Sequence, residues 1–313
     1  MIEVRDLTKR FNSKDDVAAV DHLSFVVAEG EIFGLLGPNG AGKTTVIKIL
    51  TTLLKPTSGT ATVAGFDVRT EKNKVRESIG IVFQEPSLDW RLTGRENLDF
   101  HARMYGLKRG EREKRIAEAL KLVELEDKAD IVTDKYSSGM KRRLEIARGF
   151  IHDPQVFFLD EPTLGLDTQT RRRIWEYIRE VNEREHVTIV LTTHQMEEAD
   201  YLCDHVGIMD HGKLIALDTP KNLKDLISSD LVSLELNMDV SNYDLDVFKQ
   251  LDFVIEFQEH NDIVTLKMER AELRIPAIMD AARRGGIEIK SVNLRKPSLE
   301  DVFLHFTGRR IRE

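Results

Sequence analysis

The segment Gly37–Thr44 contains the residues of this sequence whose types and spacing most clearly suggest a chemical task. It reads GPNGAGKT and fits the pattern G-x-x-x-x-G-K-[ST]. Glycines in such a loop let backbone N–H groups surround phosphate oxygens, and a following helix adds the positive end of its dipole. The pattern predicts a nucleoside triphosphate site formed by Gly37, Pro38, Asn39, Gly40, Ala41, Gly42, Lys43, Thr44 and Thr45.

Three side chains of this loop have separate predicted tasks. The ammonium group of Lys43 would neutralise β- and γ-phosphate oxygens. The hydroxyl of Thr44 would bind Mg²⁺, which bridges the same oxygens, and Thr45 would reach the α-phosphate. These tasks define a triphosphate site but leave open what the hydrolysis drives.

Two adjacent carboxylates form a second chemical group. Asp160 and Glu161 follow the apolar run Val156–Leu159, so a buried strand delivers both of them. We expect Asp160 to hold Mg²⁺ through water. We expect Glu161, which points in a different direction, to polarise the attacking water as a general base.

Buried strands must position these groups. Apolar runs at Ile32–Leu36, Val156–Leu159 and Val187–Leu191 are each followed by a polar cluster and a helical pattern. Such runs predict a parallel sheet covered on both faces, with active residues beyond the carboxyl ends of its strands. We expect the helix after the phosphate loop to span Thr44–Leu54.

The chain divides into two predicted domains. Helical spacing of apolar residues indicates a helical subdomain at about 87–150, within a first domain of residues 1–219. Thr219 and Pro220 together are typical of a helix start and mark the boundary. Residues 220–313 follow a β-α-β-β-α-β order typical of ferredoxin-like folds, with a helix from about Ala271 to Arg284 and a capping box at Ser298.

Composition restricts the remaining possibilities. The net charge of the 313 residues is −8, whereas a nucleic-acid-binding protein usually carries a basic field, so we expect no nucleic-acid partner. The sequence has no run of about 18 consecutive apolar residues, so we expect no membrane-spanning helix. The one cysteine, Cys203, favours a reducing compartment and has the apolar neighbours of a core residue.

A third motif makes a family resemblance visible. Ser137–Gly149 reads SSGMKRRLEIARG and begins 23 residues before Asp160. With the phosphate loop and the carboxylate pair, it resembles the ATP-binding subunits of ABC transporters over residues 1 to about 220. Leu191–Asp204 (LTTHQMEEADYLCD) and Lys296–Phe303 (KPSLEDVF) resemble the daunorubicin-resistance type of drug exporter, which works with separate ABC-2 membrane proteins.

The resemblance implies a fold, ligands and a dimer. The fold would be α/β, an ABC-type P-loop NTPase with a mixed sheet and a helical subdomain, followed by a small α+β ferredoxin-like domain. ATP and Mg²⁺ would be the ligands. Two such domains close head to tail in this family, so the signature of one chain would cap the γ-phosphate held by the other. That signature is Ser137, Ser138, Gly139 and Met140, and it departs from the usual L-S-G-G-Q at Ser138 and Met140.

Four further residues match the family's pattern. Gln84 would touch Mg²⁺ and the attacking water, and His194 would contact the γ-phosphate. Asp167 would lie in the segment that passes between the two sites across the dimer. Phe11 stands where an aromatic residue stacks on adenine, although a core position would suit it equally.

We therefore expect an ATP-hydrolysing subunit of an ABC transporter, with export as the expected direction. It would be a peripheral protein on the cytoplasmic face of the membrane, bound to ABC-2 permease subunits and paired as a homodimer or with a paralogue. The alternative is a soluble ATPase of the same superfamily that acts in DNA repair or translation. Only 53 residues separate Gln84 from Ser137, which leaves no room for the long coiled coil of the repair proteins. The cargo stays open.

Overall fold

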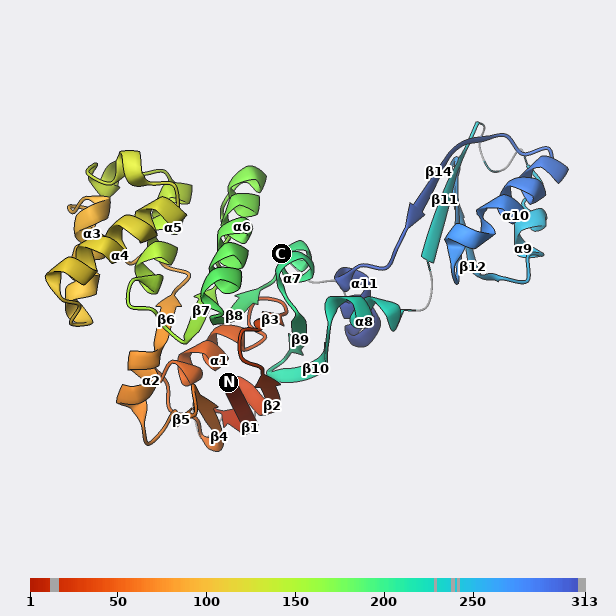
Figure 1. The fold of residues 1–313 in the computed structure, drawn as a ribbon. Coiled ribbons are helices and arrows are strands. Elements are labelled where there is room, and N and C mark those ends of the chain that lie inside the picture. Colours follow the sequence, from red (N-terminus) through yellow and green to blue (C-terminus); the bar gives the residue numbers. More distant parts are fainter. Residues whose placement is uncertain (12–16, 228–229, 238–239, 241–242, 309–313) are drawn as a thin grey trace. The chain divides into compact units, whose positions relative to one another are not determined.

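The computed structural model describes residues 1–11, 17–227, 230–237, 240 and 243–308. Met1–Pro220 and Lys221–Arg310 form two compact units (Figure 1). Among the described residues, no helix combines the length and the apolar composition that crossing a bilayer requires.

A mixed six-stranded sheet forms the centre of the first unit. Its strand order is β10-β9-β3-β8-β7-β6; all neighbouring pairs are parallel except the β9–β10 hairpin. Every residue of β3, β7 and β8 is buried, as the continuous apolar runs predict. The strands are β3 (Ile32–Leu36), β6 (Ile79–Val82), β7 (Val156–Asp160), β8 (Thr188–Thr193), β9 (His205–Asp210) and β10 (Lys213–Asp218).

An antiparallel sheet packs with α1 (Lys43–Leu50) against the central one. Phe25 of this sheet stacks on Phe33 of β3, with ring centroids 5.0 Å apart, inside a common apolar core. Helix α1 ends at Leu50, so the expected end at Leu54 is wrong. Thr52 has a φ of 65°, a left-handed conformation that cannot continue the helix. The antiparallel strands, in the order β2-β1-β4-β5, are β1 (Ile2–Lys9), β2 (Val20–Val27), β4 (Ser58–Val63) and β5 (Phe66–Asp67).

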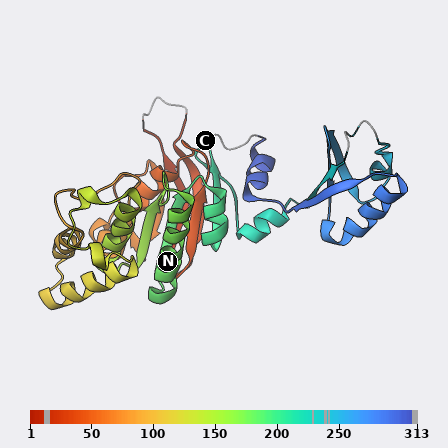
Figure 2. The same cartoon turned by 90° about the horizontal axis from the view of Figure 1, so that it is seen from above.

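Helices connect the parallel strands. Three of them, α3, α4 and α5, share an apolar core around Leu98, Leu120 and Leu144, and both views place them away from β9 and β10 (Figures 1 and 2). They carry the chain from β6 to β7. The helices of this unit after α1 are α2 (Lys72–Ser78), α3 (Gly94–Met104), α4 (Arg109–Leu122), α5 (Ser138–Phe150), α6 (Thr168–Glu185) and α7 (Met196–Leu202).

The second unit has the ferredoxin-like order that the sequence predicts. Its antiparallel sheet runs β12-β13-β11-β14, and α10 packs on it through Ile278 and its neighbours. Helix α10 spans Ala271–Arg284, as expected, and Ser298 and Asp301 form the capping box of α11. The other elements are α8 (Pro220–Asp225), β11 (Asp230–Leu236), α9 (Asp246–Lys249), β12 (Val254–His260), β13 (Ile263–Met268), β14 (Ile289–Arg295) and α11 (Leu299–Thr307).

Candidate functional site

The phosphate loop joins β3 to α1 and is fixed by its neighbours. Gly37 N donates to Thr193 O at 3.2 Å, and Gly212 N donates to Ala41 O at 3.0 Å. Gly42 has a φ of 102°, and a β-carbon there would overlap Ala19 O. Glycine is therefore required at this position by the backbone itself, in addition to any approach of phosphate.

Lys43 lies inside this loop and is only 5% exposed. Its Nζ donates to Gly37 O at 2.7 Å and to Pro38 O at 3.1 Å, and it lies 3.5 Å from Glu161 Oε1. Burial lowers the pKa of Lys43 below its usual range, while the carboxylate of Glu161 acts in the opposite direction. The ammonium group is thus held where the loop carbonyls and a carboxylate compete for it.

Asp160 receives two hydroxyl donors at the end of β7. Thr192 Oγ1 donates to Asp160 Oδ1 at 2.6 Å, and Thr44 Oγ1 donates to the same atom at 3.0 Å. The Asp160 side chain is 2% exposed. Hydroxyl and carboxylate oxygens are ligands that Mg²⁺ prefers, so Thr44 and Asp160 bring suitable donors together.

Glu161 has a left-handed backbone, with φ at 51°. Its N–H is held by both Thr192 O and Thr192 Oγ1, each at 3.1 Å. Its Oε2 lies 2.6 Å from Nδ1 of His194, the residue that follows β8. A non-glycine residue at positive φ beside titratable partners is typical of a functional site. The structure therefore brings Lys43, Glu161 and His194 into one cluster.

The signature residues begin helix α5. Ser137 is the N-cap, and its Oγ accepts a hydrogen bond from Met140 N at 3.2 Å. Ser137 and Ser138 are exposed, whereas Gly139 is buried. A β-carbon on Gly139 would lie 2.6 Å from Thr170 Cγ2, so the first turn of α5 packs closely on α6. Among the described residues, no hydrogen bond or ion pair joins this turn to the phosphate loop.

Within the part of the chain that the structure describes, no hydrogen bond or ion pair joins three of the predicted site residues to this cluster. Asp167 is the N-cap of α6 and accepts from Thr170 N at 2.9 Å and from Thr170 Oγ1 at 2.7 Å. Gln84 is exposed two residues after β6. Phe11 is 60% exposed, and Lys9 Nζ lies 5.4 Å from its ring centroid. The roles of Asp167, Gln84 and Phe11 stay predictions, and a core position for Phe11 is wrong.

The sequence reasoning missed three residues that hold the cluster in place. They are Thr192, Arg142 and Glu145, which are 0%, 7% and 2% exposed. Thr192 could have been found from its place at the carboxyl end of a buried strand. Arg142 and Glu145 give no such signal, because charged residues on a helix ordinarily face the solvent.

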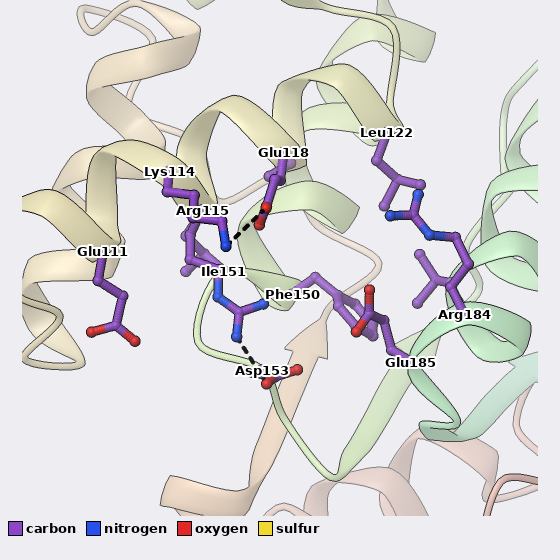
Figure 3. Close-up of a pocket in the computed structure, with 12 residues that line it drawn as sticks. Glu111, Lys114, Arg115, Glu118, Leu122, Phe150, Ile151, Asp153, Arg184 and Glu185 are labelled. Atoms are coloured by element: carbon purple, nitrogen blue, oxygen red, sulfur yellow. Dashed lines mark hydrogen bonds and ion pairs between the residues drawn. The ribbon is translucent and has the colours of Figure 1, made fainter.

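A separate cavity of about 410 Å³ lies between α4, the end of α5 and α6 (Figure 3). Lys114 points toward Glu118 at 3.7 Å, and Arg115 reaches Asp153 at 2.9 Å. No residue of the phosphate loop lines it, and these four charged side chains pair with one another. The cavity is therefore distinct from the cluster around Lys43.

Comparisons with known proteins agree with the motifs. The model of the ABC transporter family matches residues 20–164. A second family model, ATP-binding protein DrrA1-3-like, C-terminal domain, matches residues 219–307.

Two relatives are similar over almost the whole chain. The linearmycin resistance ATP-binding protein LnrL of Bacillus subtilis is 36% identical over 100% of both chains. The daunorubicin resistance ATP-binding protein DrrA2 of Streptomyces coeruleorubidus is 38% identical over 99% of this chain and 95% of its own length.

Solved structures resemble the first unit. One is the dimeric structure of a post-hydrolysis state of the ATP-binding cassette MJ0796, bound to ADP and Pi. Its sequence is 28% identical, its TM-score is 0.64, and the match covers 70% of this chain and 98% of the MJ0796 chain. The protein cbiO1 from Clostridium perfringens, part of the ABC transporter complex cbiONQ, is 32% identical with a TM-score of 0.66, covering 72% and 92%.

Proposed function

This chain belongs to the family of ABC-transporter ATP-binding subunits, and we propose that it binds and hydrolyses ATP at the carboxyl ends of β3, β7 and β8. One observation carries the proposal: Lys43, the adjacent pair Asp160 and Glu161, and His194 come from three distant parts of the sequence and are brought together at one edge of the sheet. The family is one of ATP-hydrolysing enzymes. The comparisons give no support to a role in DNA repair.

Binding starts from the loop and its lysine. Phosphate oxygens of ATP would replace Gly37 O and Pro38 O as hydrogen-bond acceptors of the Lys43 ammonium group, because they carry more negative charge than peptide carbonyls. Mg²⁺ would be held by Thr44 and Asp160, with Gln84 as the third predicted ligand. When bound, it would neutralise the negative charge that develops on the phosphates during hydrolysis.

Hydrolysis would use Glu161 as the general base. Its carboxylate would accept a proton from the water that attacks the γ-phosphorus, while the bond to the β–γ bridging oxygen breaks and ADP leaves. His194 would hold this carboxylate through Nδ1, which leaves its other ring nitrogen to face the γ-phosphate. The left-handed backbone of Glu161 fixes the direction in which the carboxylate points.

Each site would be completed by a second subunit. The exposed Ser137 hydroxyl and the N-terminal end of α5 suit an anion, and they would cap the γ-phosphate on a partner chain. Asp167 lies next to this cap because Thr170, which it binds, packs against Gly139. Closure of the dimer around ATP would then drive the transport step.

We further propose export through separate ABC-2 permease subunits at the cytoplasmic face of the membrane. Relatives named for resistance to linearmycin, daunorubicin and doxorubicin support this direction. Those three compounds are the first cargoes to test in vesicles that contain this chain and its permease.

Two variants test the catalytic assignment. Lys43→Ala should abolish ATP binding. Glu161→Gln should bind ATP but turn it over at least a hundredfold more slowly, and it should accumulate as an ATP-bound dimer. An exposed carboxylate on α6, Glu180, supplies the control Glu180→Gln. Undiminished turnover by Glu161→Gln would remove Glu161 as the base.

A further inference from the structure

Arg142, on the helix that the signature begins, binds the segment that carries the catalytic carboxylates. Its Nε donates to Pro162 O at 2.7 Å, and its Nη2 donates to Asp160 O at 3.1 Å and to Glu161 O at 3.0 Å. A buried guanidinium with three consecutive carbonyl partners holds that stretch of backbone in one conformation.

The other end of the same guanidinium reaches the chain beside Gln84. Arg142 Nη1 donates to Phe83 O at 2.6 Å and lies 3.3 Å from Glu145 Oε2. Glu145 Oε1 in turn accepts from Ser87 N at 2.6 Å. The two side chains therefore hold the Gln84 segment at both of its ends, Phe83 and Ser87.

The conformation of Glu161 needs such support. Its φ of 51° is uncommon for a residue with a side chain, and such strain persists only where the surroundings impose it. Thr192 holds the N–H of Glu161, and Arg142 holds its carbonyl. Without the hydrogen bond to Glu161 O, the backbone of Glu161 would relax to a more favourable φ, and its carboxylate would point in another direction.

We propose that Arg142 and Glu145 are positioning residues that fix the Gln84 segment and the Glu161 peptide relative to one another. The proposal rests on the catalytic assignment above, and it adds a physical link that runs through the helix of the signature itself. Arg142 acts through Glu161, and Glu145 acts through Ser87 and Arg142. Neither one needs to touch ATP.

The main test is Arg142→Lys. Lysine keeps the charge and the partnership with Glu145, but its single ammonium group cannot reach Phe83 O and the carbonyls of Asp160–Pro162 together. The kcat for ATP hydrolysis should fall about tenfold, which corresponds to about 1.4 kcal/mol, while the KM for ATP stays within about twofold.

The matched control is Arg112→Lys. Arg112 is also a largely buried arginine of the helical subdomain, and it also binds a carboxylate, Asp99, and a carbonyl, Leu107 O. Among the described residues, no hydrogen bond or ion pair joins Arg112 to Asp160, Glu161 or Pro162. Its kcat should not change. Thermal unfolding of both variants, followed by circular dichroism, corrects each rate for the folded fraction.

A second variant changes Glu145, which binds the Gln84 segment at Ser87. Glu145→Ala frees Ser87 N and should also lower kcat, and the double variant with Arg142→Lys should lose no more than the worse single variant. If Arg142→Lys does not fold, the kcat of Glu145→Ala alone tests the positioning role.

The outcomes separate the two proposals. If the wild-type protein hydrolyses no ATP, or Lys43→Ala hydrolyses it normally, the proposed function fails. If the wild type is active but folded Arg142→Lys and Glu145→Ala keep its kcat, or Arg112→Lys loses as much, the positioning role is refuted.

Discussion

Replacing Thr192 by valine should disturb the site more than its small change in shape suggests. The side chain is fully buried, and its hydroxyl donates to Asp160 Oδ1 at 2.6 Å while accepting from Glu161 N at 3.1 Å. Valine keeps the volume and removes both bonds. The N–H of Glu161 retains Thr192 O, so the main loss falls on the carboxylate of Asp160.

The expected magnitude follows from the charge of the lost partner. A hydrogen bond to a charged group contributes about 1.5–3 kcal/mol, whereas a neutral bond contributes about 1 kcal/mol. Thr188→Val is the matched control, because Thr188 lies on the same strand, is equally buried and accepts only a neutral bond from Gly30 N at 3.0 Å. Thr192→Val should therefore lower the free energy of unfolding by about 2–3 kcal/mol and Thr188→Val by about 1 kcal/mol.

Urea unfolding would measure these losses, and an ATPase titration with Mg²⁺ would measure the effect on the site. A loosely held Asp160 should raise the Mg²⁺ concentration that gives half-maximal rate in Thr192→Val and leave it unchanged in Thr188→Val. Equal losses of stability, together with an unchanged Mg²⁺ dependence, would refute the role given to this hydroxyl.

Three other predictions concern the signature turn and a partly buried histidine. Ser138→Gly should keep or raise ATPase activity because Ser138 is exposed, and a severe loss would show that its side chain takes part in the cap. Gly139→Ala should lower activity, since the new methyl group would press on Thr170 Cγ2; unchanged dimer formation and turnover would contradict this. Burial, followed by the charges of Arg148 and His152, lowers the pKa of His101 to about 4, so the unfolded chain binds more protons between pH 6.5 and 4. Stability should therefore fall through that window as the pH is lowered, by roughly 1 to 2 kcal/mol from pH 7 to pH 5, and urea unfolding of His101→Leu should lack this part of the loss.

Local and contiguous features were readable from the sequence. The phosphate loop, the carboxylate pair after β7 and the ends of α10 are each encoded within a few neighbouring residues, because backbone conformation and strand burial depend on nearby residue types. Continuous apolar runs also predicted three of the parallel strands, β3, β7 and β8, correctly. The end of α1 was misjudged, since the left-handed Thr52 has no marker in its residue type.

Contacts between distant segments were decided only by the fold. Arg142 is 59 residues from Phe83, Glu145 is 58 from Ser87, and Thr192 is 32 from Asp160, yet these pairs hold together the edge of the sheet that we propose to be catalytic. In the sequence, Arg142 and Glu145 look like the solvated side of a helix. A charged side chain becomes a buried positioning group only when packing removes water from it and supplies carbonyl and carboxylate partners. Those partners come from distant parts of the chain and meet only in the folded protein.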